Sequence, residues 1–194
     1  MSTGTNGDSV PPANCVDLDK NSPRITLNVN GLNALAKRHR VSEWIKKKDP
    51  SICPLQETHF RPEDTFRLRV RGWRIIYHAT GSQKNTGVAI LISDKLDFQL
   101  KAVTRDEEGH YTIITGSIHQ EELTIINVYA PNTRAPKYIK QLITNRNNIM
   151  DKNVVIAGDF NTPLTEMDRS SRHTVNKDTR ALNDTLDQMD LKDI

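Results

Sequence analysis

The chain lacks any long uninterrupted apolar stretch, and this absence excludes several classes of protein. No apolar run approaches the ~20 residues that a transmembrane helix needs, and hydrophobic residues make up only 36% of the 194. The N-terminus also lacks the apolar core of a signal peptide. We therefore expect a protein that is neither secreted nor embedded in a membrane, and that resides in the nucleus, the cytoplasm or both.

Cysteine is equally scarce. Only Cys15 and Cys53 occur, without the CxxC spacing of redox or zinc motifs, so we expect reduced thiols and exclude a disulfide framework. A strong charge imbalance is missing too, since the formal net charge is +3. The first 22 residues are acidic, with three Asp and one Lys, so the positive charge lies in the remainder. That remainder favours anionic partners without identifying one.

Two regions differ in composition. Residues 1–22 are rich in Ser, Gly, Asn, Asp and Pro, which predicts a disordered lead. Residues 23–194 are long enough for one domain with a substantial core. Apolar runs predict strands at 25–29, 52–57, 87–93, 111–118, 123–129 and 154–159, and apolar residues at helical spacing predict helices at 35–48, 136–149 and 177–191. Interleaved helices and strands predict an α/β fold with a mixed sheet.

Polar or aromatic side chains stand at the ends of four of the predicted core strands. They are Asn28, Glu57, Tyr129, and Asp159 with Asn161. One such residue is unremarkable, because an Asp after Gly is usually a turn former and Glu57 could be a helix-start carboxylate beside Thr58. Active sites of layered α/β folds sit where strand ends meet loops, so four such ends in one chain favour a site.

The chemistry of these side chains suits phosphodiester hydrolysis. A Mg²⁺ or Mn²⁺ ion needs oxygen ligands, typically one or two carboxylates together with water and substrate phosphate, and Glu57 fits that role. Asp159 could orient or deprotonate an attacking water. Asn28, Asn161 and Tyr129 could hold phosphate oxygens without adding negative charge. The pattern therefore indicates electrostatic and metal-assisted catalysis.

Several blocks of sequence carry a family resemblance. LNVNGL, LQETH, GVAILIS, NVYAPN and GDFNTPL, in this order, resemble the endonuclease/exonuclease/phosphatase superfamily. KRHRVSEWIKKKDPS, GHYTIITGSI, EELTIINVYAPNT and DRSSRHTVNKDT narrow the resemblance to the endonuclease domain of mammalian long interspersed element (LINE) retrotransposons. The similarity runs from about residue 24 to the last residue, and several long blocks agree.

The resemblance implies a four-layer α/β/β/α sandwich with two mixed sheets, and Mg²⁺-dependent nicking of double-stranded DNA. By the same resemblance, Glu57 is the metal ligand, with Asn28 and Asp159 nearby. Asp159 positions the water nucleophile with Asn161 beside it, and Asn28 and Tyr129 surround the metal and the phosphate.

The family pattern continues with a further Asp and a Ser-Asp-His triplet, and none of the six histidines here stands in such a triplet. We therefore expect this chain to lack the last strands of its sheets, to be an aggregation-prone monomer, and to nick supercoiled plasmid negligibly. Pro54 is a second departure, because proline cannot donate a hydrogen bond within a sheet, and it lies three residues before Glu57.

Alternative functions remain open from the sequence. The closest alternative is an apurinic/apyrimidinic repair endonuclease or exonuclease III-like nuclease, and another is a non-catalytic remnant with weak DNA binding or no function. The candidate DNA-binding residues lie on the basic helix at 35–48, whose commoner explanation is a solvated face. They are Lys37, Arg38, Arg40, Lys46, Lys47 and Lys48. An alternating segment, Arg67 to Arg71, is interpreted as an exposed strand edge.

Overall fold

The computed structural model describes residues 25–79, 86–145, 153–162, 177–188 and 191. The predicted lead at 1–22 lies outside these ranges. Within them, no helix combines the length and the apolar character needed to cross a membrane.

The first half of the chain forms one four-stranded sheet. Its strands lie in the order β1 (Leu27–Asn28), β2 (Ile52–Gln56), β4 (Val88–Ser93) and β3 (Trp73–Ala79). β1 and β2 are parallel and the other pairs are antiparallel. Helix α1 (Leu35–Lys48) packs on this sheet, and a 3₁₀ helix η1 (Pro62–Arg67) follows β2.

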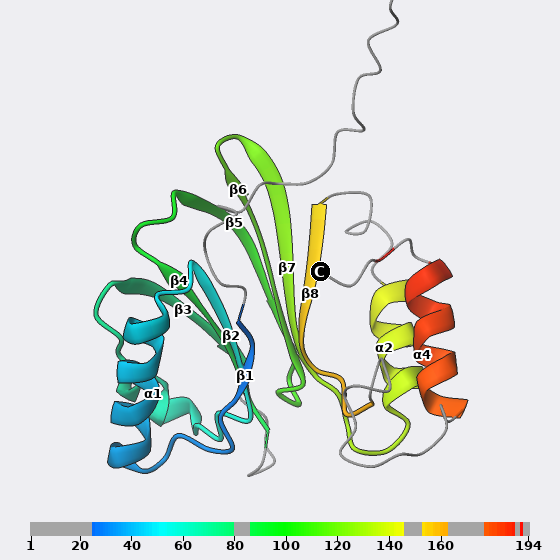
Figure 1. The fold of residues 1–194 in the computed structure, drawn as a ribbon, viewed down its shortest axis with the longest axis horizontal. Coiled ribbons are helices and arrows are strands. Elements are labelled where there is room, and N and C mark those ends of the chain that lie inside the picture. The colour runs from blue at the N-terminus through cyan, green and yellow to red at the C-terminus, as the bar shows by residue number, and fades with distance from the viewer. Residues whose placement is uncertain (1–24, 80–85, 146–152, 163–176, 189–190, 192–194) are drawn as a thin grey trace, which may run out of the picture.

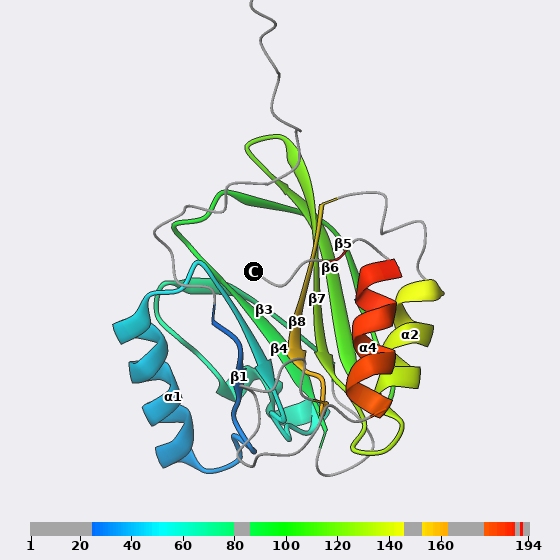
Figure 2. The same ribbon diagram turned by 45° about the vertical axis from the view of Figure 1, so that its right-hand side comes forward.

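The second half forms a second sheet whose strands keep their order in the chain. These are β5 (Phe98–Arg105), β6 (Tyr111–Ile118), β7 (Glu121–Tyr129) and β8 (Asn153–Asp159). The last pair is parallel and the others are antiparallel. Helices α2 (Ala135–Thr144) and α4 (Lys177–Gln188) lie side by side on its outer face (Figures 1 and 2).

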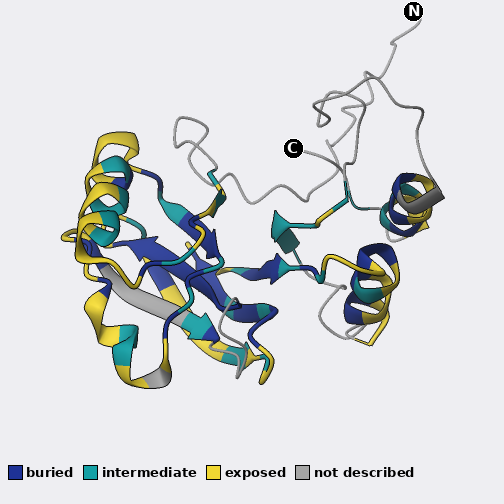
Figure 3. Cartoon of the chain, turned by 90° about the horizontal axis from the view of Figure 1, so that it is seen from below, coloured by how far each residue is buried: buried dark blue, intermediate teal, exposed yellow. Residues whose placement is uncertain are grey.

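The resulting order of layers is helix, sheet, sheet and helix pair, as Figure 1 shows from left to right. The predicted α/β class and four-layer sandwich with two mixed sheets are confirmed. Strand alternation explains why each sheet has two buried faces. Cys53 and Leu55 of β2 pack with α1, whereas Ile90 and Ile92 of β4 face the second sheet. Figure 3 shows buried residues along the strands and exposed ones on the outer faces of the helices.

The register of β2 explains how the sheet accommodates Pro54. The carbonyl of Gln56 accepts a hydrogen bond from Val29 N on the β1 side, so the backbone of Pro54, two residues earlier, faces the same side. Pairing with β1 begins only at Leu55, opposite Leu27. The proline therefore sits beyond the paired part of β1, where no donor is needed, and it leaves the ladder that leads to Glu57 intact.

Two parts of the sequence-based interpretation need correction. The alternating segment Arg67 to Arg71 is not a strand edge, because η1 ends at Arg67 and a loop follows. Strands β3 and β5 were not predicted. β5 is an edge strand with mostly exposed residues, so it lacks the apolar run by which a buried strand is recognised.

Candidate active site

The predicted site residues meet at one end of the two facing sheets. Asn28 ends β1, Glu57 follows β2, Tyr129 ends β7 and Asp159 ends β8. β1 is parallel to β2 and β7 is parallel to β8, so the carboxyl ends of each pair reach the same edge. Contacts of β8 with both β1 and β2 bring the two edges together across the sandwich.

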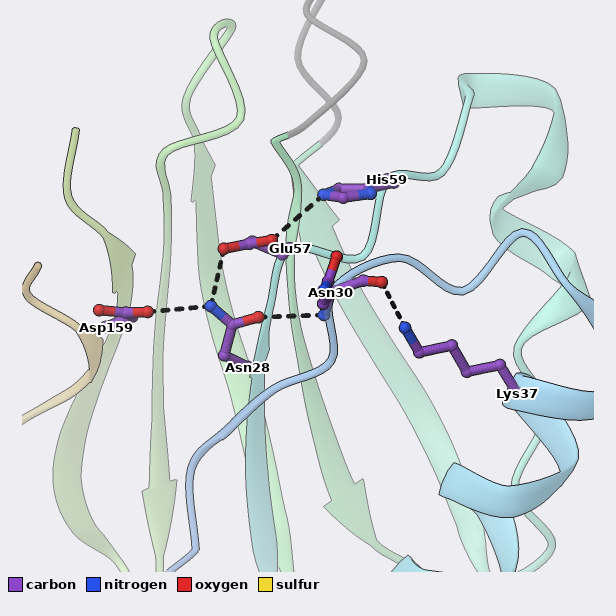
Figure 4. Close-up of polar contacts among 6 residues, drawn as sticks. All are labelled: Asn28, Asn30, Lys37, Glu57, His59 and Asp159. Atoms are coloured by element: carbon purple, nitrogen blue, oxygen red, sulfur yellow. Dashed lines mark hydrogen bonds and ion pairs between the residues drawn. The ribbon is translucent and has the colours of Figure 1, made fainter. Parts of the chain in front are cut away.

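The side-chain amide of Asn28 joins the two carboxylates. Its Nδ2 donates to Glu57 Oε1 at 2.8 Å and to Asp159 Oδ2 at 2.9 Å (Figure 4). Its Oδ1 accepts a hydrogen bond from the backbone N–H of Asn30 at 3.0 Å, which fixes the orientation of the amide. The nitrogen must therefore face the carboxylates, so Asn28 acts here as a donor that holds two like charges together rather than as an oxygen ligand.

The loop after β2 turns Glu57 toward this centre. Glu57 has φ +53° and His59 has φ +55°, a left-handed conformation that is uncommon for residues other than glycine and that clusters at functional sites. Backbone hydrogen bonds hold the loop: Gly31 N donates to Glu57 O at 2.6 Å, and Thr58 N donates to Gly87 O at 3.0 Å. The strained conformation is thus supported by both neighbouring segments.

His59 is a site residue that sequence reasoning did not single out. Its Nε2 lies 3.5 Å from Glu57 Oε2, and its side chain is 14% exposed (Figure 4). Gly31 is what makes room for this ring, because a Cβ at Gly31 would come within 2.8 Å of His59 Nδ1. His59 is the last residue of the LQETH block, two residues after Glu57, and its position in that block is the one sequence feature that indicates it.

Asp159 is held from two directions. Asn28 binds Oδ2, and the backbone N–H of Asn161 donates to Oδ1 at 3.0 Å. The Asn161 side chain donates to the carbonyl of Ala130 at 2.5 Å, which ties the turn after β8 to the end of β7. Both oxygens of the carboxylate are therefore oriented, as a group that positions a water molecule requires.

Tyr129 completes the cluster. Burial raises the pKa of its phenol, and a hydrogen bond with Glu57 and the nearby negative charges of Glu57 and Asp159 raise it further. Its side chain also hydrogen-bonds with Asn161, which acts in the opposite direction. The phenol is protonated at neutral pH even at its ordinary pKa, and the raised pKa extends this to more alkaline pH, so it is a hydrogen-bond donor within the carboxylate cluster.

Behind the site, a buried polar cluster links the two sheets. Asn127 of β7 is fully buried, and its Nδ2 donates to the carbonyls of Leu55 at 2.9 Å and Ala89 at 2.8 Å. Its Oδ1 accepts from Gln56 Nε2 at 2.6 Å. Gln56 directly precedes Glu57, and Asn127 lies two residues before Tyr129. This cluster therefore fixes one sheet against the other at the level of the site.

The basic residues of α1 divide into two groups. Lys37 donates to the carbonyl of Asn30 (Figure 4), and Arg38 Nη1 donates to the carbonyls of Leu32 at 2.8 Å and Asn33 at 2.6 Å. Both side chains thus stabilise the loop that carries Asn30 through hydrogen bonds to its carbonyl groups. The others, Arg40, Lys46, Lys47 and Lys48, are exposed on the helix, and their contact with DNA stays a prediction.

The donor set fits a hard divalent cation. Among the residues that the structure describes, no three His, Cys, Asp or Glu side chains cluster as a complete metal cage. Two carboxylates held by one amide nitrogen instead match the partial oxygen shell that Mg²⁺ accepts when water and phosphate supply the remaining ligands. Glu57 and Asp159 are the residues that could hold such an ion.

Known proteins resemble this chain in sequence. The model of the Endonuclease/Exonuclease/phosphatase family matches residues 25–189. The Transposon TX1 uncharacterized 149 kDa protein of Xenopus laevis is 28% identical over 150 residues, which cover 75% of this chain and 11% of that protein.

Two solved structures of apurinic/apyrimidinic (AP) endonucleases have a similar fold. The Leishmania major AP endonuclease LMAP superposes with a TM-score of 0.63 at 14% identity, covering 84% of this chain and 65% of that one. The Archaeoglobus fulgidus AP endonuclease gives 0.54 at 24% identity, covering 84% and 69%.

D. rerio TDP2, solved with a single-strand DNA product, gives a TM-score of 0.55 at 17% identity, covering 71% of this chain and 60% of that one. The chain thus spans about a tenth of its transposon relative and about two thirds of these solved structures. Because the family match extends over most of the sequence and agrees with the fold, the chain belongs to the endonuclease/exonuclease/phosphatase family.

Proposed function

We propose that the cluster around Asn28 is the metal-holding and water-orienting part of a site for phosphodiester hydrolysis in DNA. The observation that carries the proposal is the amide nitrogen of Asn28, which binds Glu57 and Asp159 at 2.8 and 2.9 Å. The negative charges of Glu57 and Asp159 repel each other. A bound cation would offset that repulsion, so the placement of both carboxylates on the Asn28 amide favours a cation site.

Each side chain has a distinct part in this proposal. Glu57 holds the divalent cation, Mg²⁺ or Mn²⁺, which when bound neutralises charge on the phosphate. Asp159, with both oxygens oriented, accepts a proton from a water molecule whose oxygen then bonds to phosphorus. The P–O bond to one sugar oxygen breaks in the same step, and that leaving oxygen takes a proton from solvent. The Tyr129 phenol donates to a phosphate oxygen. Asn161 keeps the turn after β8 in place, so that Asp159 cannot rotate away from the Asn28 amide.

DNA is the substrate that the relatives favour. One relative is a transposon protein and one solved structure holds a DNA product. The exposed residues Arg40, Lys47 and Lys48 of α1 provide positive charge for sequence-independent phosphate contact, whereas Lys46 is paired with Glu43 at 2.9 Å. The transposon relative supports nicking of intact target DNA, in the manner of LINE endonucleases, over action at abasic sites. Comparing intact and abasic duplexes separates these two activities.

Metal binding is the first test. Titration of the 194-residue chain with Mn²⁺, followed by electron paramagnetic resonance of the free ion, should show one site. Glu57→Gln should lower its affinity by at least about tenfold, the lower end of what the loss of a supporting residue costs. Asp97→Asn is the matched control, because Asp97 lies in the turn before β5 at the other end of the sheet. Equal affinity in wild type and Glu57→Gln would refute the proposal.

Hydrolysis itself is a separate measurement. The sequence-based expectation for this 194-residue chain, negligible nicking of supercoiled plasmid in Mg²⁺, stays a prediction. Robust nicking that disappears in Asp159→Ala would refute that expectation while supporting the roles of the residues. Nicking that persists without a divalent cation, or in Asp159→Ala, would contradict those roles.

A further inference from the structure

His110 has no part in the proposed hydrolysis, yet it forms hydrogen bonds with the backbone of Tyr129 through both its own backbone and its side chain. In the ladder between β6 and β7, Tyr111 lies opposite Val128, so the next pair would be His110 and Tyr129. The first half of that pair is made by the backbone, because Tyr129 N donates to His110 O at 2.7 Å.

The second half is made by a side chain. The backbone N–H of His110 donates to Asp106 Oδ2 at 2.8 Å, so it is directed away from β7. Its place is taken by the imidazole, whose Nδ1 lies 2.8 Å from the carbonyl oxygen of Tyr129. A carbonyl can only accept, so Nδ1 carries a proton. Since Nδ1 keeps this proton in the neutral and the charged ring, the contact does not depend on the charge of His110.

The imidazole also packs on aromatic rings. His110 is 9% exposed, and its ring stacks on that of Tyr129 with centroids 6.0 Å apart and an angle of 19° between the planes. The ring of Tyr138, on α2, packs against it at 5.7 Å. One histidine thus contacts both the main chain and the ring of Tyr129, whose phenol hydrogen-bonds with Glu57 and lies near Asp159.

We propose that His110 is the positioning residue for Tyr129: its Nδ1–H closes the last pair of the β6–β7 ladder, and so holds the strand end from which the phenol extends. The functional meaning rests on the proposed role of Tyr129 in hydrolysis. Without the imidazole, the Tyr129 carbonyl loses its donor at a strand end, and the phenol gains freedom to leave the carboxylates.

Fluorine NMR of the chain labelled with 3-fluorotyrosine tests this directly, with the Tyr129 signal assigned by its loss in Tyr129→Phe. His110→Phe keeps a ring but removes the donor. His110→Asn removes the ring but keeps a side-chain N–H at the position of Nδ1. His119→Ala, in the exposed turn between β6 and β7, is the control.

We expect the Tyr129 resonance to shift by more than its linewidth and to broaden in His110→Phe, to return toward the wild-type position in His110→Asn, and to be unchanged in His119→Ala. A wild-type Tyr129 resonance in His110→Phe would overturn the proposal, as would an equal displacement in His110→Asn. A purely structural role predicts a lower unfolding temperature with the native Tyr129 signal unmoved.

The spectra are recorded first without metal, so they report on positioning even if no ion binds. Addition of Mg²⁺ then forms a second readout, in which the Tyr129 resonance of wild type should respond more strongly than that of His110→Phe. Absence of a Mg²⁺ response in wild type would count against the proposed function, and it would leave the metal-free comparison to decide the role of His110.

Discussion

Replacing Asn127 with leucine is expected to weaken the connection between the two sheets. The side chain is fully buried and makes three hydrogen bonds, to the carbonyls of Leu55 and Ala89 and from the Gln56 amide. Leucine has the same number and branching of side-chain heavy atoms as asparagine, so the substitution removes the polar groups without leaving a cavity. At about 0.5–1.5 kcal/mol for each net hydrogen bond, the substitution should cost about 1.5–4.5 kcal/mol of unfolding free energy.

Urea denaturation followed by circular dichroism measures this loss. A change of about 3 kcal/mol is a large share of the roughly 5–15 kcal/mol that stabilises a typical domain, and it lowers the melting temperature by roughly 6–12 °C in a protein of this size. Gln99→Leu is the control, because Gln99 is an exposed amide on β5 whose replacement should stay within about 0.5 kcal/mol.

A double-mutant cycle separates the polar cluster from general packing. Asn127→Leu and Gln56→Leu remove the two ends of the 2.6 Å hydrogen bond, so their effects should be non-additive by about 0.5–3 kcal/mol. An unchanged urea midpoint for Asn127→Leu, or simple additivity of the two substitutions, would refute the idea that this cluster fixes one sheet against the other.

Two further predictions concern Gly158 and Cys53. At Gly158 φ is +144°, and an added Cβ would lie 1.9 Å from Val128 O. At Gly72 φ is +93°, but nothing lies within 4 Å of an added Cβ. Gly158→Ala should therefore lower the melting temperature clearly more than Gly72→Ala, and equal melting temperatures would contradict this. Burial raises the pKa of the Cys53 thiol to about 12, so its neutral form contributes stability that is complete below pH 9 and is lost as pH rises toward 12. In a Cys15→Ser background, Cys53 should react with a thiol reagent at pH 8 only after unfolding, and rapid reaction of the native protein would refute its burial.

The sequence predicted the strands that carry long apolar runs. β4, β6, β7 and β8 were placed within a few residues, and α1 with its bounds, Leu35–Lys48. An edge strand such as β5 gives no such signal, since most of its side chains face solvent. Pro54 is a residue for which the sequence predicted more disruption than the structure shows. Its effect on β2 depends on the residue at which β1 begins to pair with β2, and the sequence alone does not reveal that register.

The residues of the candidate site were predicted, but their connections were not. Asn28 and Asp159 are 131 positions apart, and no local pattern indicates that one amide binds both carboxylates. His59 and His110 were missed for a related reason. Each acts on a neighbour, Glu57 or Tyr129, through a contact that exists only once the loops are folded.

The most direct test of the central claim is the position of a bound ion. Crystals of the chain soaked in Mn²⁺ should give an anomalous difference peak beside the Glu57 carboxylate and near Asp159, and Glu57→Gln crystals soaked in the same way should lose it. Absence of a peak at this cluster in wild type, or a peak that survives in Glu57→Gln, would contradict the assignment of Glu57 as the metal ligand.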